Sequence, residues 1–226
     1  MPPAPLPPLP PLRGCLLSGG ASRRMGRDKA LLPHPEGGTW LERQLRLLAG
    51  LGAPVTLLSG WPAHLENAAP LVGSPGLQGV ALELLGEPLG RQGEKDPAGP
   101  LVALARLMEA HPDERLLLCP IDLPALTLPC LRALLDATDA DPDAIWIATP
   151  EETGAPPQPL VGIYPSDAKH RQSLGEALAR GERGLQRWLA GERTRRYTLP
   201  STTLANMNTF EVWQAWKGMG NPKAEL

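Results

Sequence analysis

The chain has 226 residues, of which 42% are hydrophobic and 20% charged, a composition typical of a globular domain with its own core. The formal net charge of −2 gives no electrostatic reason to expect binding to nucleic acid or to a membrane surface, and no apolar run of 18 residues predicts a membrane span. Cys15, Cys119 and Cys130 show neither CxxC spacing nor an even count, so we expect reduced thiols and a cytoplasmic protein.

The N-terminal segment differs in composition from the rest of the chain. Residues 1–12 are mostly proline and carry no charged side chain. They lack the basic start and the continuous apolar helix of a signal peptide, and we expect a disordered leader. A proline-rich ligand for another protein is the alternative. The following residues, 13–220, predict a single domain.

From residue 13 onward, short apolar runs alternate with stretches of helical periodicity. Strands are predicted over residues 14–18, 54–58, 115–119, 144–149, 159–164 and 195–199. Helices are predicted over residues 39–48, 101–110, 128–135, 167–180, 185–189 and 210–217. Thr39 and Glu42 form a capping box at the start of the first helix. Apolar strands that alternate with helices favour a layered α/β domain with a mostly parallel central sheet.

This fold class also predicts where a ligand binds. In open parallel sheets, ligands bind outside the carboxyl ends of the strands, so the loops after the strands are candidate sites. Residues 86–100, rich in proline and glycine, are the one long stretch to which neither helix nor strand is assigned. We interpret this stretch as either a mobile loop over a site or a surface insertion.

The loop after the first strand concentrates glycine and positive charge. Gly19 and Gly20 follow the strand directly, and adjacent glycines let the backbone approach a ligand and direct N–H groups at phosphate oxygens. The glycine spacing fits neither a P-loop nor a dinucleotide-binding fingerprint. A solvated basic turn is the alternative, but the double glycine after a buried strand favours polyphosphate binding. The four cations of this loop are Arg23, Arg24, Arg27 and Lys29.

Residues 17–29 read Leu-Ser-Gly-Gly-Ala-Ser-Arg-Arg-Met-Gly-Arg-Asp-Lys. This segment resembles the signature loop of the MobA-like nucleotidyltransferases, L-A-G-G-x-S-x-R-M-G-x-D-K, and only Ser18 departs from it. The resemblance implies a three-layer, Rossmann-like nucleotidyltransferase domain whose loop wraps a nucleoside triphosphate. Arg24 and Lys29 are then expected to stabilise the charge on the leaving pyrophosphate. The nucleotide-binding residues that the resemblance implies in this loop are Leu17, Ser18, Gly19, Gly20 and Lys29.

A second candidate site follows the strand predicted over residues 115–119. Asp122 lies where such a sheet presents ligands, and a hard cation such as Mg²⁺ is commonly held by one or two carboxylates plus substrate phosphates. Alternatively, Asp122 caps the following turn. The sequence Asp122-Leu123-Pro124 resembles the Asp-Met-Pro-like element of the same family. That resemblance implies that Asp122 binds Mg²⁺ and is catalytic.

Another element resembles the family at residues 99–101, Gly-Pro-Leu, which match the start of a Gly-Pro-Leu-Ala-Gly element beside the nucleotide. A proline in the first turn of a helix, with no ligand, explains the same residues. In the family an acidic residue upstream contacts the nucleotide. We assign that role to Asp96, with Glu87 and Glu94 as alternatives.

Near the C-terminus, residues 206–209 resemble an Asn-x-Asn-Thr element that precedes the last helix of these enzymes. Asn206 and Asn208 are predicted to hydrogen-bond a pterin or a phosphate. The alternative is that Asn208 or Thr209 is only the N-cap of the last helix. Ser59, after the second strand, is predicted to contact the nucleotide by the same resemblance.

Four histidines are scattered along the chain and show no metal-ligand spacing. We expect them at the surface rather than in a metal site. They are His34, His64, His111 and His170.

The resemblance implies that GTP is the donor, a molybdopterin-bound molybdenum cofactor is the acceptor, and Mg²⁺ is the metal. It also implies contacts with other proteins of molybdenum cofactor biosynthesis or with apo-molybdoenzymes. Two alternatives stay open at this point. One is a cytidylyl- or sugar-nucleotidyltransferase of the same fold, and the other is a nucleotide-binding protein without catalysis.

Overall fold

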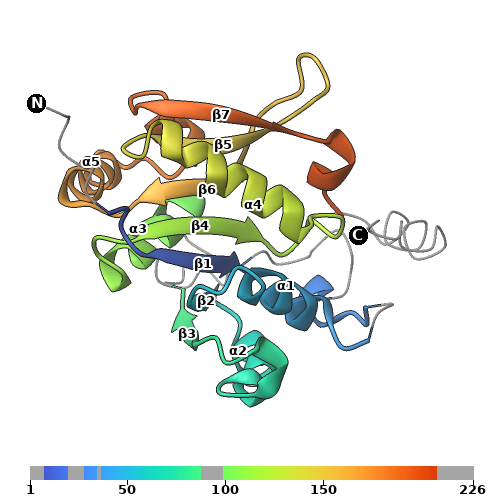
Figure 1. The fold of residues 1–226 in the computed structure, drawn as a ribbon. Coiled ribbons are helices and arrows are strands. Elements are labelled where there is room, and N and C mark those ends of the chain that lie inside the picture. The colour runs from blue at the N-terminus through green and yellow to red at the C-terminus, as the bar shows by residue number, and fades with distance from the viewer. Residues whose placement is uncertain (1–7, 20–27, 35–36, 88–98, 208–226) are drawn as a thin grey trace, which may run out of the picture.

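A computed structural model describes residues 8–19, 28–34, 37–87 and 99–207. The structure confirms the α/β fold expected from the sequence (Figure 1). Its strands are β1 (Leu12–Leu17), β2 (Val55–Ser59), β3 (Leu82–Gly86), β4 (Arg115–Pro120), β5 (Ile145–Pro150), β6 (Gln158–Pro165) and β7 (Thr194–Leu199). Its α-helices are α1 (Trp40–Ala49), α2 (Pro62–Ala68), α3 (Pro100–Ala110), α4 (Leu128–Ala137), α5 (Ala168–Ala179) and α6 (Leu185–Leu189).

The seven strands form one sheet in the order β3-β2-β1-β4-β6-β5-β7. β1 pairs in parallel with both β2 and β4, and β3 and β7 also pair in parallel with their neighbours. β6 runs antiparallel to β4 and β5. The chain moves from β1 outward to β3 and then returns to the other side of β1 as β4. This reversal of strand order creates a switch point at the carboxyl ends of β1 and β4.

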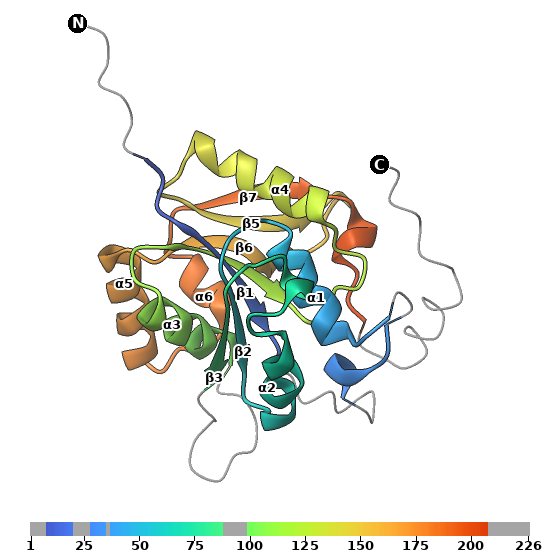
Figure 2. The same ribbon diagram turned by 60° about the horizontal axis from the view of Figure 1, so that its bottom comes forward.

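Helices cover both faces of the sheet and make it the middle of three layers (Figure 2). On one face, α1 and α4 pack on the sheet through buried leucines that include Leu45 and Leu131. On the other face, α3, α5 and α6 pack through residues that include Leu104 and Trp188. Successive residues of β4 alternate between the two cores, since Leu117 belongs to the first and Leu118 to the second. Burial on both sides explains why this strand is apolar without interruption.

Thr39 caps α1 as predicted, because its side chain accepts a hydrogen bond from the Glu42 backbone N–H at 3.2 Å. The structure confirms the other predicted strands and helices up to residue 204, with small shifts at their ends. The helix predicted over residues 210–217 lies outside the described residues. So do residues 88–98, which make up most of the unassigned stretch 86–100.

Two elements were not predicted, and each has a physical reason. β3 is a short edge strand that carries an exposed Glu83 and ends at Gly86, so it lacks the continuous apolar pattern of the central strands. α2 has seven residues and buries only His64 and Ala68, which is too few for a helical hydrophobic pattern.

The described structure begins ahead of the predicted domain boundary at Arg13. β1 starts at Leu12, and the backbone N–H of Arg115 donates to the Pro11 carbonyl at 2.7 Å. The Arg115 guanidinium also donates to the Pro10 carbonyl at 3.1 Å. Residues 1–7 of the predicted leader lie outside the described residues.

The three cysteines are free thiols, as expected, and Cys15 and Cys119 are fully buried. Burial raises the pKa of both buried thiols, which keeps them protonated and unreactive. Among the described residues, no helix is long and apolar enough to cross a membrane.

The prediction of surface histidines is wrong, because all four are at least 95% buried. A neutral imidazole can be buried when its nitrogens find partners or its ring packs on another ring. His34 packs edge-on against the Trp40 ring, with centroids 4.6 Å apart. His170 contacts the Asp167 carboxylate at 2.8 Å.

His111 belongs to a polar cluster at the amino-terminal ends of the central strands. Its Nε2 lies 3.0 Å from Thr56 Oγ1, and Thr56 also accepts a hydrogen bond from Arg13 at 3.3 Å. Arg13 forms a two-pronged ion pair with Glu114, at 2.8 and 3.1 Å. Burial, and then the nearby Arg13 charge, lower the pKa of His111 below its ordinary value of 6.5.

This cluster predicts a pH dependence of stability. Below about pH 6.5 the unfolded chain protonates His111 while the folded protein resists protonation, so the free energy of unfolding falls as the pH falls. The slope from one such proton is at most about 1.4 kcal/mol per pH unit. Urea unfolding between pH 5 and 8 should show a shallower decline in His111→Gln than in the wild type. Parallel profiles for the two proteins would contradict the assignment.

Candidate nucleotide-binding site

A cavity of about 360 Å³ opens at the switch point, at the carboxyl ends of β1 and β4. These strands end side by side, since Leu17 pairs with Pro120. A larger cavity of about 500 Å³ lies between α3 and α5, but it contains none of the predicted site residues. The residues that line the cavity at the switch point are Leu17, Gly19, Lys29, Glu87, Gly99, Pro100, Ala103, Pro120, Ile121, Asp122 and Leu160.

The structure brings Lys29 and Asp122 together in this cavity, although 93 positions separate them in the sequence. Lys29 Nζ donates to Asp122 Oδ2 at 3.1 Å. The two side chains are only 12% and 21% exposed. The predicted phosphate-binding lysine and the predicted metal-binding aspartate therefore share one site.

Local structure fixes the position of Lys29. Residues Lys29–Leu31 form a 3-10 turn whose N-cap is Asp28, and the Asp28 carboxylate accepts from the Ala30 backbone N–H at 3.0 Å. Ala30 is fully buried and belongs to the core of the α1 face. The turn is thus anchored from both its cap and its buried side, and it directs Lys29 into the cavity.

Asp122 follows the end of β4 by two residues and is held by backbone contacts around it. The N–H of Ile121 donates to the Leu17 carbonyl at 3.1 Å, and Gln44 donates to the Leu123 carbonyl at 2.8 Å. The Met207 N–H donates to the Asp122 carbonyl at 2.8 Å. Within the described part of the chain, the Asp122 carboxylate contacts Lys29 and caps no backbone N–H. The alternative of a simple turn cap therefore receives no support.

Glu87 is a cavity residue that the sequence argument placed second to Asp96. It follows β3 directly, and its backbone N–H donates to the Ser59 carbonyl at 2.9 Å. Burial raises the pKa of its carboxyl from 4.5 to about 7. A Cβ added at Gly19 would lie 2.1 Å from Glu87 Oε2, so any side chain at position 19 would displace the Glu87 carboxyl. Because β3 was not predicted, the position of Glu87 directly after a strand was not visible in the sequence, and nothing favoured Glu87 over Asp96.

The amino-terminal end of α3 also faces the cavity. Gly99 is its N-cap with φ of 102°, a conformation that favours glycine, and Pro100 occupies the first turn. Both residues line the cavity. The positive end of the helix dipole and the N–H groups of this end favour an anionic ligand there.

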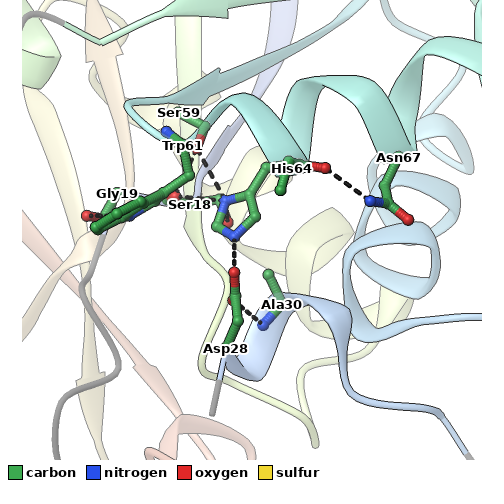
Figure 3. A network of polar contacts seen from close by, with 9 residues as sticks. Ser18, Gly19, Asp28, Ala30, Ser59, Trp61, His64 and Asn67 are labelled. Carbon is green, nitrogen blue, oxygen red and sulfur yellow. Dashed lines mark hydrogen bonds and ion pairs between the residues drawn. The ribbon is translucent and has the colours of Figure 1, made fainter. Parts of the chain in front are cut away.

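Ser18 and Ser59 do not line the cavity with their side chains. Both are almost completely buried, and their hydroxyls lie 2.9 Å from His64 Nδ1 (Figure 3). Asn206 is exposed, one residue before the Met207 N–H that bonds Asp122. The remaining predicted site residues, Gly20, Arg24, Asp96 and Asn208, lie outside the described residues.

The donor set suits a cation that arrives with a nucleotide. Among the residues with described positions, no three histidine, cysteine, aspartate or glutamate side chains are grouped as a metal cage. Asp122 nevertheless presents a hard oxygen donor to the cavity, and Mg²⁺ is commonly held by one or two carboxylates plus substrate phosphates. The residues present therefore fit a magnesium–nucleotide complex better than a metal held by protein alone.

Comparison with known proteins places these features in a family. The family model for the MobA-like NTP transferase domain matches residues 14–197. A Rhodopirellula baltica protein named "Probable molybdenum cofactor guanylyltransferase" is 34% identical over 210 residues, covering 88% of this chain and 89% of its own length.

Solved structures of low sequence identity share the fold. The molybdopterin-guanine dinucleotide biosynthesis protein A from Archaeoglobus fulgidus has a TM-score of 0.66 at 14% identity, covering 92% of this chain and 97% of its own. The 4-diphosphocytidyl-2C-methyl-D-erythritol synthase from Anaerococcus prevotii also has a TM-score of 0.66, at 9% identity, with coverages of 93% and 96%. The fold is therefore common to proteins whose names refer to different nucleotides.

The raised pKa of Glu87 predicts a direct titration. We expect its carboxyl carbon to titrate near pH 7 in ¹³C NMR spectra, with Glu87→Gln used to assign the signal. The folded protein holds this proton after the unfolded chain has lost it, so Glu87 lowers stability as the pH rises from 4.5 to 7. Glu87→Gln should therefore raise the Tm relative to the wild type more at pH 8 than at pH 5. A titration below pH 5 would show that the carboxyl is well solvated.

Proposed function

Since the chain belongs to the MobA-like NTP transferase family, we propose that it transfers GMP from GTP to a molybdopterin-bound molybdenum cofactor. The products are the guanine dinucleotide form of the cofactor and pyrophosphate. The observation that carries this proposal is the Lys29–Asp122 contact inside the cavity at the switch point. It joins a phosphate-binding cation and a metal-binding carboxylate, the two groups that nucleotidyl transfer requires.

In the proposed reaction, a phosphate oxygen of the acceptor attacks the α-phosphorus of GTP. The new phosphorus–oxygen bond forms as the bond from the α-phosphorus to the bridging oxygen of the β-phosphate breaks. Alignment and charge neutralisation carry most of the rate enhancement in such transfers. Lys29 neutralises charge on the leaving pyrophosphate, and we assign the same role to Arg24.

Asp122 would hold Mg²⁺, which when bound supplies charge neutralisation on the phosphates. Lys29 uses the same carboxylate, at 3.1 Å, so the cation and the lysine compensate the same negative charge. A triphosphate offers Lys29 new oxygen partners close to its present position. The ion pair therefore keeps Lys29 near the place where it meets the phosphates.

The remaining assignments complete the proposal. Leu17, Gly19 and Gly20 lie at or next to the start of the loop that contacts the nucleotide, and Asp96 or Glu87 supplies the acidic contact. Asn206 and Asn208 bind the acceptor, which agrees with the hydrogen bond that ties the neighbouring Met207 to Asp122. A cytoplasmic location and contacts with other proteins of molybdenum cofactor biosynthesis belong to the same proposal.

Nucleotide selectivity provides the first test. With Mg²⁺ present, GTP at about 100 times its Kd should add about 2.7 kcal/mol to the free energy of unfolding. For a domain of this size, that corresponds to a rise of about 5 to 10 °C in Tm. ATP, CTP and UTP at the same concentration should give much smaller shifts. Stabilisation by CTP alone would instead favour the cytidylyltransferase alternative, and no shift with any nucleotide would refute nucleotide binding.

Replacement of the metal-binding carboxylate tests catalysis. Asp122→Asn should lower the rate of pyrophosphate release by about 100-fold or more, because charge stabilisation in the transition state is lost. Circular dichroism should show an unchanged fold, since the backbone contacts of residue 122 remain. Asp136→Asn, at an exposed position of α4, is the matched control and should keep full activity. Near wild-type activity in Asp122→Asn would exclude the proposed role.

A further inference from the structure

His64 contacts both ends of the loop formed by residues 20–27. Its Nδ1 lies 2.9 Å from the Ser18 carbonyl oxygen and 2.9 Å from Ser18 Oγ. On the other side of the ring, Nε2 lies 2.7 Å from Asp28 Oδ2 (Figure 3). His64 is only 2% exposed, so its contacts with Ser18 are shielded from water, whereas the Asp28 side chain is 38% exposed. One buried imidazole thus links the residue before the loop's glycines to the residue before Lys29.

Both ring nitrogens of His64 have hydrogen-bond partners. Nε2 faces a carboxylate, which only accepts, so Nε2 carries a proton and donates to Asp28. Ser59 Oγ donates to the Ser18 carbonyl at 2.8 Å and accepts from the Trp61 N–H at 3.1 Å. The Ser18 hydroxyl, the Ser59 hydroxyl and the Ser18 carbonyl oxygen all lie 2.9 Å from Nδ1, so this nitrogen has a hydrogen-bond partner whether it donates or accepts. Every polar atom of the ring is satisfied, which fixes its orientation.

The connection from β2 to α2 holds the same end of the loop through a second contact. Trp61 is the N-cap residue of α2, and its indole Nε1 donates to the Gly19 carbonyl at 3.1 Å. His64 lies in the first turn of the same helix. The short helix therefore presents Trp61 to Gly19 and His64 to Asp28 from one rigid element.

Asp28 transmits this contact to Lys29. One oxygen of the Asp28 carboxylate accepts from His64 and the other caps the turn over Lys29–Leu31. Partial burial is the largest single influence and raises the pKa of Asp28, but the contact with His64, the Ala30 N–H and the Lys29 charge together outweigh it and lower that pKa. This turn places Lys29 within hydrogen-bonding distance of Asp122.

We propose that His64 is a positioning residue that fixes Asp28 and, through it, places Lys29 for contact with the phosphates of the nucleotide. This inference rests on the proposed nucleotide site, and it assigns a role to a side chain that lines no part of the cavity. Ser18 is the one residue that departs from the family signature. In this proposal its side chain hydrogen-bonds His64 and does not contact the nucleotide.

Two substitutions at position 64 test the contacts of the two ring nitrogens separately. In His64→Gln, the longer amide places an N–H near the position of Nε2 and keeps the contact with Asp28. In His64→Asn, the shorter amide reaches Ser18 and loses Asp28. The control is His170→Asn, which makes the same substitution at an equally buried histidine on α5, a helix that contributes no residue to the cavity.

Calorimetric titration with Mg²⁺ and GTP, below the lowest Tm of the set, measures the effect. Loss of a residue that orients a ligand-binding side chain typically lowers affinity or activity by about 10- to 100-fold. We expect His64→Asn to weaken binding by about tenfold or more, His64→Gln by less than about threefold, and His170→Asn not at all. Equal losses in His64→Asn and His170→Asn would show a general effect of destabilisation and overturn the proposal.

A double-mutant cycle tests whether the effect passes through Lys29. In a Lys29→Met background, His64→Asn should cause almost no further loss of GTP affinity. Fully additive losses would mean that His64 acts by another route, and the proposal would fail.

A measurement without nucleotide separates this proposal from the proposed function. Competitive acetylation, read by mass spectrometry, reports how firmly Lys29 is held in its ion pair. The acetylation rate of Lys29 should rise several-fold in His64→Asn and stay near the wild-type rate in His64→Gln and His170→Asn. If the wild type binds no nucleotide, the proposed function fails while this rate still decides the role of His64. An unchanged rate in His64→Asn would overturn the positioning role.

Discussion

The parallel pairing of β1 with β4 is the constraint on which the site depends. Because both strands run in the same direction, Leu17 and Pro120 end at the same edge of the sheet. Every residue that follows either strand is then delivered to one place, whatever its distance along the chain. The Lys29–Asp122 contact, across 93 positions, is a direct consequence of this pairing. The reversal of strand order at the same edge leaves room there for the cavity.

The charged groups of the cavity differ in whether they have a partner of opposite charge. Lys29 and Asp122 compensate each other at 3.1 Å, so both can remain charged although they are largely shielded from solvent. Among the described residues, the Glu87 carboxyl has no such partner, and burial alone raises its pKa to about 7. A neutral Glu87 avoids repulsion of a triphosphate, whereas a ligand that donates a hydrogen bond favours its charged form. The site therefore offers one fixed charge pair and one carboxyl that responds to what is bound.

The strands of the sheet were easier to predict from the sequence than the contacts between side chains. β1 and β4 are apolar throughout because helices cover both faces, and that pattern is visible without a structure. Lys29 and Asp122 were found because each follows such a strand within a recognisable motif. β3 was not predicted because an edge strand with an exposed Glu83 lacks the pattern, and without it Glu87 remained only an alternative to Asp96. The partners of His64 were not predictable, since they depend on contacts across 36 and 46 positions that carry no periodic signal.

The buried histidines show why polarity in the sequence is a poor guide to exposure in this protein. An imidazole with both nitrogens satisfied loses little on burial, whereas an unsatisfied polar group in the same place is costly. His64 and Ser18 meet this requirement for each other behind the cavity wall. An alanine at position 18 would remove one of the two hydroxyls that lie 2.9 Å from Nδ1 and leave only that of Ser59. The serine at this position and the histidine on α2 are therefore best understood as a pair, in which each residue makes the burial of the other favourable.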